Sequence, residues 1–469
     1  MTTRKWSVKN AARVTGAGIT AVLAIAALGV VGVSGQSFEF GQDLNTPIEQ
    51  NVVLPNQIFE VVCAPGVETE VGAAGSGQVT VSETDGIEVL QATDLGSGEE
   101  IAATKSGELT VYKSKSPVGL TVRSQSDASF LALSRSEASE DVRGMVIDQC
   151  QPARGTSWFT VGATTVGESA LLTVSNPSQQ ATQVTVSGWS ATGPLEETPT
   201  FTVSAQSTET VNLAAYFPEN ERLGIQVEAT GPGAVSTIRT VGMDGLAPQG
   251  IDAITGTDTA SNTVGLVGLE KDLEDPKLRL LNPGDNEINA EVTLLTEDGL
   301  MGLSGSEAIT LDPGAVFQLS LDGLATDVAT VVINASEPIL ASMSATAVGK
   351  PNEDGKPVGD RIVWVPSQAA TEFATLVPSG GDKASSVLNI ANPNEDVVEV
   401  TINGKSHEIG PLSMTAQKVS AGEVLVESDR PVYASLTSIV DRADGKIVSN
   451  VSLTDAGETV PATKLVVEH

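Results

Sequence analysis

The residue types that carry most enzymatic chemistry are sparse in this chain of 469 residues. It contains two histidines, His407 and His469, whereas a catalytic triad needs an imidazole held between a nucleophile and an orienting acid. His407 follows the turn-like pair Asn403-Gly404, so we expect it to face solvent, and His469 is the last residue. These positions favour a non-catalytic protein.

Carboxylates are abundant, since 59 Asp and Glu residues give the chain a net charge of −33. Asp298, Asp354 and Asp444 stand in turn-like stretches, where short polar residues have structural uses. No two acids can be paired by spacing as the carboxylates of a glycosidase. The acidic stretches 269–276 and 351–360 lack the calcium-loop pattern. We therefore predict no catalytic residues, no metal site and no cofactor.

The N-terminal stretch predicts where the rest of the chain resides. Four basic residues precede positions 14–33, which are twenty residues without a charge and long enough to cross a bilayer as a helix. A basic flank favours the cytoplasmic side. We expect a cytoplasmic tail at residues 1–13 and a transmembrane anchor, or a cleaved signal segment, at residues 14–35. In both cases the bulk of the chain is extracytoplasmic at the cell membrane.

The two cysteines, Cys63 and Cys150, both fall in this exported part. An even number of cysteines in an oxidising compartment favours a disulfide. A metal site is the competing interpretation, but neither cysteine has a further Cys or His nearby in the sequence. We predict a structural Cys63–Cys150 disulfide. The strongly negative charge also argues against nucleic acid as a partner.

A pattern repeated four times occupies the exported part. An apolar run ends in Asn-Pro at Asn176, Asn282 and Asn392, and Ala64 takes the place of the asparagine in the first copy. Each later copy then has a Pro followed four residues on by Ser, and after that an Asp-Gly pair. The Pro and Ser positions are Pro232 and Ser236, Pro338 and Ser342, and Pro431 and Ser435. Such ordered marks indicate a repeated fold.

The repeat period of about 108 residues, with about seven short strands in each copy, is typical of immunoglobulin-like sandwiches. Propeller blades of about 40–50 residues are the alternative. We predict an all-β protein: an N-terminal transmembrane helix followed by tandem immunoglobulin-like β-sandwich repeats. The predicted repeats span residues 36–150, 151–257, 258–370 and 371–469. The spacing leaves open whether they form a straight rod or fold back on one another.

The Asn-Pro pair has a structural explanation. Proline lacks a backbone N–H, and the asparagine before it can hydrogen-bond a nearby backbone group through its side chain. Together they can end one strand and direct the next, which favours punctuation over a catalytic motif.

Exposed aromatic faces are the usual sugar-binding platforms, and this chain has few aromatic residues. Trp364 lies among apolar residues and is predicted to pack in a core. Trp189 stands near the end of a strand-like run, so it is the candidate for contact with a ligand.

Residues 150–188 resemble the signature of a family of membrane-anchored extracytoplasmic proteins of high-GC Gram-positive bacteria, known as a domain of unknown function. The matching residues are Cys150, Pro152, Trp158, Phe159, Gly162, Asn176 and Pro177. The resemblance implies a cell-envelope location, and it transfers no catalytic residue to this chain.

We therefore expect a non-catalytic extracytoplasmic scaffold or adaptor that binds another envelope or membrane protein. The alternative is a cell-wall polysaccharide-binding accessory subunit of an envelope glycan enzyme. A hydrolase that uses turn carboxylates is a third hypothesis.

Overall fold

A computed structural model of the chain describes residues 48–52, 57–64, 77–83, 86–125, 130–139, 142–303, 308–324, 326–379, 383–456 and 463–467. The chain divides into two units, one of residues 1–52 with 464–469 and one of residues 53–463. Strands β1 (Ile48–Val52) and β35 (Thr463–Val467) pair with each other.

The predicted tail, 1–13, and the predicted anchor, 14–35, lie outside the described residues. Within the described ranges, no helix has the length and apolar character needed to cross a bilayer.

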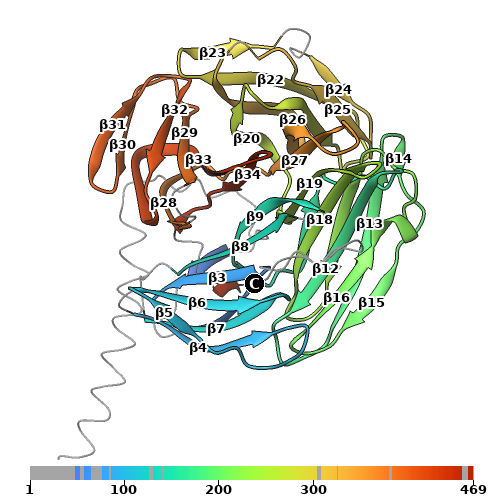
Figure 1. The fold of residues 1–469 in the computed structure, drawn as a ribbon, viewed down its shortest axis with the longest axis vertical. Coiled ribbons are helices and arrows are strands. Elements are labelled where there is room, and N and C mark those ends of the chain that lie inside the picture. The colour runs from blue at the N-terminus through green and yellow to red at the C-terminus, as the bar shows by residue number, and fades with distance from the viewer. Residues whose placement is uncertain are drawn as a thin grey trace, which may run out of the picture. The chain divides into compact units, whose positions relative to one another are not determined.

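The 53–463 unit is all-β, as predicted, and a short 3-10 turn, η1 (Leu213–Ala215), interrupts its described strands. Its described strands fall into four consecutive groups, which we call repeats 1 to 4: β2–β10, β11–β19, β20–β27 and β28–β34. In each group two layers of strands enclose an apolar core. The repeats follow one another in chain order from blue to red in Figure 1.

Repeat 1 has one sheet in the order β10-β2-β7-β4 and a second in the order β5-β6-β3-β8-β9. The first sheet contains β2 (Gln57–Cys63), β4 (Ile87–Asp94), β7 (Val118–Ser124) and β10 (Gln151–Pro152). The second contains β3 (Gly77–Ser82), β5 (Thr104–Ser106), β6 (Leu109–Ser114), β8 (Leu131–Ser139) and β9 (Arg143–Gln149).

Repeat 2 also has two separate sheets, in the orders β11-β17-β13-β14, with β15 beside β13, and β16-β12-β18-β19. The first sheet contains β11 (Thr156–Phe159), β13 (Thr182–Ser190), β14 (Gly193–Pro194), β15 (Thr200–Val203) and β17 (Gly224–Ala229). The second contains β12 (Glu168–Asn176), β16 (Ser207–Asn212), β18 (Val235–Asp244) and β19 (Ala247–Thr255).

In repeats 3 and 4 a single long strand belongs to both layers. In repeat 3, β26 (Val328–Pro351) pairs first with β20 and β22 and then with β21 and β27. In repeat 4, β33 (Gly422–Arg442) does the same with β28 and β30 and then β29 and β34. The change of partners occurs around Pro338 and Pro431, where a missing N–H suits a corner between layers.

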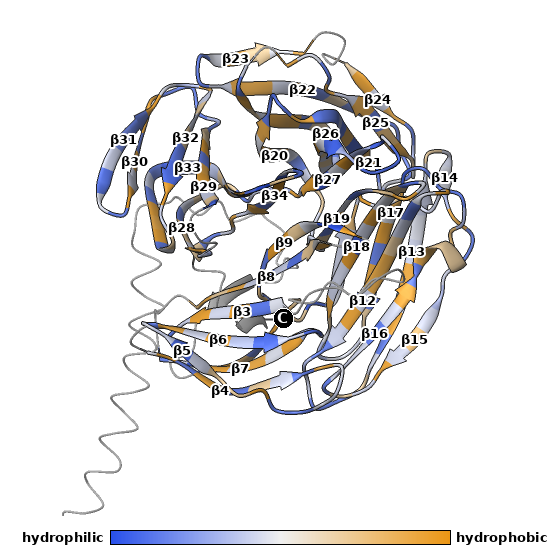
Figure 2. Ribbon diagram, in the orientation of Figure 1, coloured by the Kyte–Doolittle hydropathy of each residue, from blue (hydrophilic) through white to orange (hydrophobic). Residues whose placement is uncertain are grey.

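The remaining strands of repeat 3 are β20 (Ser261–Glu270), β21 (Glu274–Leu281), β22 (Ile288–Thr296), β23 (Gly299–Gly302), β24 (Ile309–Leu311), β25 (Val316–Ser320) and β27 (Pro357–Trp364). Those of repeat 4 are β28 (Ala370–Val377), β29 (Ala384–Asn392), β30 (Val398–Ile402), β31 (Lys405–Ile409), β32 (Ser413–Val419) and β34 (Gly445–Ser452). Hydrophilic residues cover much of β31, at the outer side of repeat 4, where side chains are exposed (Figure 2).

The asparagine of each Asn-Pro pair is a buried clamp between the two layers of its repeat. Asn282 donates from Nδ2 to the carbonyls of Asn286, Leu311 and Asp312, at 2.7, 3.2 and 3.2 Å. Its Oδ1 accepts the N–H of Gly284 at 2.9 Å. Asn176 and Asn392 make the corresponding four bonds in repeats 2 and 4. The interpretation of Asn-Pro as structural punctuation is thus supported by its contacts.

The turn-like pair Asn403-Gly404 forms the tip of the hairpin between β30 and β31. Ile402 pairs with Lys405, and the two residues between them have φ of 46° and 77°. Positive φ at both positions is the geometry that favours Asn-Gly in a two-residue hairpin.

Four strands, one from each repeat, meet at the centre of this unit, and we call β9, β19, β27 and β34 the central strands. β9 contacts β19, β19 contacts β27, β27 contacts β34, and β34 contacts β9 (Figure 1). The repeats of the 53–463 unit therefore form a closed cycle in which the last repeat contacts the first. The cores of repeats 1 and 4 merge there, since Leu133 and Met145 pack in one cluster with Phe373 and Leu436.

The serine of the Pro-x-x-x-Ser mark joins successive repeats. Ser342 donates to the carbonyl of Thr160 at 2.7 Å, and Ser435 donates to the carbonyl of Val267 at 2.9 Å. Each acceptor belongs to the preceding repeat. A partly buried ion pair adds to the junction of repeats 2 and 3, because both terminal nitrogens of Arg361 lie 2.6 Å from the Glu168 carboxylate.

Candidate functional site

The central strands are linked by a cycle of hydrogen bonds that involve side chains. Between β9 and β19, the Thr255 hydroxyl donates to Asp148 at 2.5 Å. Between β19 and β27, Asp252 accepts the N–H of Val363 at 2.7 Å. The other two junctions use Asp360, which accepts the N–H of Val448 at 2.5 Å, and Ser449, which accepts the N–H of Ile147 at 3.1 Å. All four junctions between repeats therefore have a polar link near the centre.

Three of these acceptors are carboxyl groups in unusual surroundings. Asp252 and Asp360 are 3 % and 0 % exposed, and burial raises the pKa of each well above its ordinary range despite the bond from a backbone N–H. Burial also raises the pKa of Asp148 to about 6, against the lowering effect of its hydrogen bonds and of Arg154. The Asp148 side chain is half-buried and lines a cavity.

At one end of the central strands, the hairpin tips are tied together by charged groups. Arg143 of repeat 1 donates from Nε to Asp444 of repeat 4 at 3.1 Å and from a terminal nitrogen to the Lys446 carbonyl at 2.9 Å. Burial alone would raise the pKa of Asp444, but the bond from Arg143 and its charge hold that pKa below the ordinary value. Lys356 pairs in the same way with Asp244, at 2.6 Å, between repeats 3 and 2.

At the other end, the four repeats enclose an open cavity of about 590 Å³, which we call the axial pocket. Each repeat contributes the end of its central strand and the residues that follow it. The contributing segments are 147–151, 253–259, 363–369 and 450–454, with further residues from 261–264 and 339–340. The pocket exists because the cycle closes, since the segment after β34 completes a wall begun after β9.

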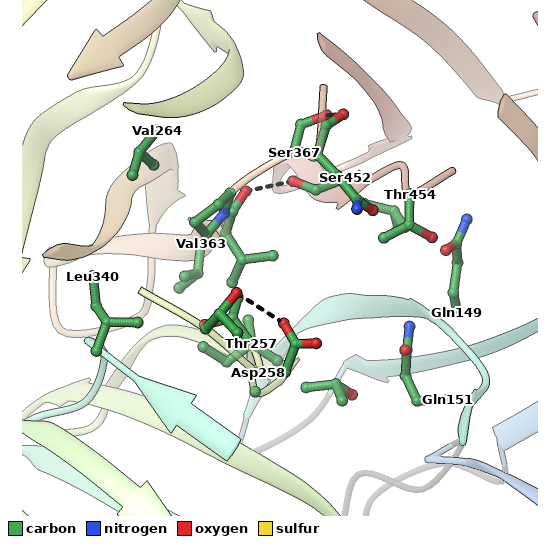
Figure 3. Close-up of a pocket in the computed structure, with 18 of the residues that line it drawn as sticks. Gln149, Gln151, Thr257, Asp258, Val264, Leu340, Val363, Ser367, Ser452 and Thr454 are labelled. Carbon is green, nitrogen blue, oxygen red and sulfur yellow. Dashed lines mark hydrogen bonds between the residues drawn. The ribbon is translucent and has the colours of Figure 1, made fainter. Parts of the chain in front are cut away.

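The lining has a polar and an aliphatic side. Figure 3 shows Gln149, Gln151 and Thr454 on one side and Val264 and Leu340 on the other. Two hydroxyls are used to hold the wall together. Ser367 donates to the carbonyls of Ala434 and Leu453, and Ser452 donates to the carbonyl of Val365.

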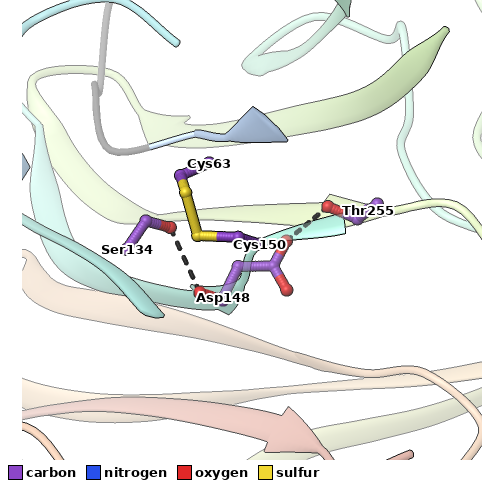
Figure 4. The surroundings of a disulfide bond; sticks show 5 residues. All are labelled: Cys63, Ser134, Asp148, Cys150 and Thr255. Carbon is purple, nitrogen blue, oxygen red and sulfur yellow. Dashed lines mark hydrogen bonds between the residues drawn. A yellow bond between two sulfur atoms is a disulfide. The ribbon is translucent and has the colours of Figure 1, made fainter. Parts of the chain in front are cut away.

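The predicted disulfide is confirmed, since Cys63 and Cys150 are bonded and lie 87 residues apart in the sequence. Cys63 ends β2 in one sheet of repeat 1, and Cys150 follows β9 of the other sheet. Figure 4 shows the bond beside Asp148 and Thr255. The disulfide therefore fixes the chain next to one wall of the axial pocket.

Trp189, the predicted ligand-contact residue, lies on β13 and is not among the residues that line the axial pocket. Its ring centroid is 5.1 Å from that of Trp158, and it packs against Leu281, Val316 and Leu340 at the junction of repeats 2 and 3. Its contact with a ligand stays a prediction. Trp364 is 1 % exposed in the core of repeat 3, as predicted.

The other residues considered for chemistry are dispersed. His407 lies on β31 opposite Val400, and His469 is outside the described residues. Asp298, Asp354 and Asp444 stand at separate turns, each beside a glycine with positive φ. In the part of the chain that the structure describes, no group of three His, Cys, Asp or Glu side chains is placed to hold a metal ion.

Sequence reasoning missed the buried aspartates and the axial pocket. The available signal was an isolated acid within an apolar run, as at Asp148, Asp252 and Asp360. A carboxyl group in such a run is expected to pair with a cation or a hydrogen-bond donor, or to have a shifted pKa. The pocket itself had no sequence signal, because its walls come from four segments that are far apart in the chain.

The fold and the pocket define an all-β protein in which four two-layered repeats share one cavity. The chain belongs to DUF5719, a family of unknown function whose model matches residues 110–425. A comparison with curated proteins finds no match.

Two solved structures show low similarity. Thermotoga maritima 1070 is 15 % identical, with a TM-score of 0.20 over 23 % of this chain and 93 % of that one. The pilus adhesin SpaC from Lactobacillus rhamnosus GG is 11 % identical, with a TM-score of 0.11 over 81 % of this chain and 56 % of that one. At TM-scores this low, neither structure informs the fold or the function of this chain.

Proposed function

We propose that the protein is a non-catalytic scaffold of the cell envelope that binds another envelope or membrane protein through the axial pocket. The proposal includes a membrane anchor at residues 14–35, immunoglobulin-like repeats and an extracytoplasmic location for the bulk of the chain. The observation that carries it is the construction of one open pocket by all four repeats. A cavity that depends on every repeat is a reason for the cycle to close.

The central strands support this role because they make the pocket rigid. Polar links join all four pairs of neighbouring central strands, and a disulfide lies beside one wall. A preorganised site loses little conformational freedom when it binds, so more of the contact energy remains as affinity.

The alternative is an accessory subunit that binds cell-wall polysaccharide. The hydroxyl and amide groups of the axial pocket favour it, because they can both donate to and accept from sugar hydroxyls. This alternative predicts saturable glycan binding that is lost in Trp189→Ala if Trp189 is the contact residue.

The test is a crosslinked pull-down of the full-length protein from its own membranes, read by mass spectrometry. We expect reproducible enrichment of one membrane or envelope protein over an untagged control. Recovery of wall polymer without any enriched protein would overturn the proposal and favour the alternative. Protease treatment of intact cells tests the location, and protection of residues 53–463 would contradict it.

A further inference from the structure

The charged groups of the axial pocket are mostly engaged by the protein itself. Arg154 donates to the carbonyl of Gly256 at 3.2 Å and to Gln151 at 3.1 Å. Asp148 accepts the Thr255 hydroxyl, while Asp258 lies exposed at the rim. A ligand that enters the pocket therefore meets mainly neutral amides and hydroxyls, although the chain carries a net charge of −33. This lining suits an uncharged ligand.

The arrangement of that lining suits an extended polypeptide. One side offers groups that both donate and accept hydrogen bonds, and the opposite side is aliphatic (Figure 3). An extended chain presents backbone N–H and C=O groups along its length, with alternate side chains pointing to opposite sides. Such a chain can satisfy the polar side and bury small apolar side chains against Val264 and Leu340.

Aromatic platforms for a sugar ring are lacking among the described residues that line the pocket. The ring of Tyr433 packs over Gly265, where an added Cβ would lie 2.8 Å from ring atoms. Trp158 and Trp189 contact each other at the junction of repeats 2 and 3. This distribution disfavours a glycan as the occupant.

We infer that the axial pocket binds an extended, uncharged segment of the partner protein. A cavity of about 590 Å³ lies within the range of about 300–1,000 Å³ that is usual for ligand sites, and it accommodates a few residues. This inference rests on the proposed function and adds the chemical class of the segment that the axial pocket contacts.

Site-specific photocrosslinking tests it in the full-length protein in its own membranes. A diazirine amino acid replaces Gln149 or Thr257 in the pocket and, as controls, exposed Thr202 on β15 or Leu300 on β23. We expect the pocket positions to crosslink one short uncharged segment of another protein. Thr454→Trp narrows the pocket and should reduce the yield of this crosslink at least tenfold. The matched variant Thr202→Trp should leave the crosslink yield within twofold of the wild-type value.

The outcomes separate this inference from the proposed function. Protein crosslinks from the control positions alone would overturn the pocket assignment and leave the scaffold role intact. Pocket crosslinks to protease-resistant, periodate-sensitive material would overturn the inference in favour of a glycan. Crosslinks from the pocket positions to a highly charged protein segment would contradict the inference that the bound segment is uncharged. The lack of crosslinks at all four positions, in folded protein, would contradict both.

Discussion

Repeat 1 and repeats 2–4 join their two layers at different places and by different means. In repeats 2–4, Asn176, Asn282 or Asn392 joins the end of a strand in one layer to a strand of the other layer. In repeat 1 the strand that corresponds to the asparagine-bearing strand is β3, because β3 pairs with β8 of the β8–β9 hairpin as β12 pairs with β18 of the β18–β19 hairpin. Cys63 ends β2, which pairs with β7 as β11 pairs with β17, so the expectation that Ala64 takes the place of the asparagine is wrong. Cys63 joins the two layers covalently through Cys150. The comparison teaches that every repeat has a link between its layers, a buried amide in repeats 2–4 and a disulfide at a different strand in repeat 1.

The largest expected effect comes from removing the covalent clamp. In the double variant Cys63→Ser and Cys150→Ser, the unfolded chain regains the freedom of a loop that spans 87 positions. The chain-entropy model then predicts a loss of about 4 kcal/mol in the free energy of unfolding. Urea unfolding of the purified full-length protein measures it. Equal stability of the variant and the wild type would show that the disulfide is no clamp, and reductant should not affect the variant further.

Removing an amide clamp should cost less. Asn282→Ala leaves three carbonyls and one N–H near the core without their partner, so we expect a loss of about 3 kcal/mol. Asn262→Ala, at an exposed position with one bond to Ala335, is the matched control and should cost less than about 1 kcal/mol. If Asn282→Ala and Asn262→Ala both lower the free energy of unfolding by less than about 1 kcal/mol, the clamp role of Asn282 is contradicted.

Replacing the Asp148 carboxylate with an amide tests the polar link beside the disulfide. The pKa of Asp148 is about 6 in the folded chain and lower when unfolded, so the folded state binds more protons and loses stability as pH rises through 6. Asp148→Asn can still accept the Thr255 hydroxyl. We expect a gain of about 1–2 kcal/mol at pH 7 and a weaker pH dependence of stability between about pH 4 and pH 6. Unchanged pH dependence in urea titrations would refute this.

The smallest expected effect concerns the polar link between the last repeat and the first. Ser449→Ala leaves the N–H of Ile147 without its acceptor, which should cost about 1 kcal/mol. Ser406→Ala on the exposed strand β31 is the control and should be close to neutral. Hydrogen exchange at Ile147 gives a local readout, and it should be faster in Ser449→Ala alone.

Sequence patterns predicted the features that depend on near neighbours. Asn403-Gly404 defines its hairpin through local backbone conformation, and the Asn-Pro pairs have nearby partners such as the residue four positions on. The disulfide was predicted because the chain has two cysteines, both in the part expected to be exported, and two cysteines leave one pairing.

The closed cycle could not be predicted in this way. Ser342 and Ser435 stood out as repeated marks, but their partners Thr160 and Val267 belong to the preceding repeats. Contact between repeats 1 and 4 joins residues about 300 positions apart, and a regular period is the same for a rod and for a cycle. The axial pocket forms because the cycle closes, so it could not be predicted from the sequence either.

Closure of the first repeat onto the last is the central claim, because the pocket and its proposed partner depend on it. The Arg442 guanidinium lies 2.5 Å from the Glu137 carboxylate, across 305 positions of sequence. The most direct test is treatment of full-length Glu137→Cys, Arg442→Cys with a short bismaleimide, while Cys63 and Cys150 remain disulfide-bonded. We predict an intramolecular crosslink between residues 137 and 442 and none in the control pair Thr202→Cys, Arg442→Cys. Separately modified thiols in a folded 137/442 variant would contradict the account.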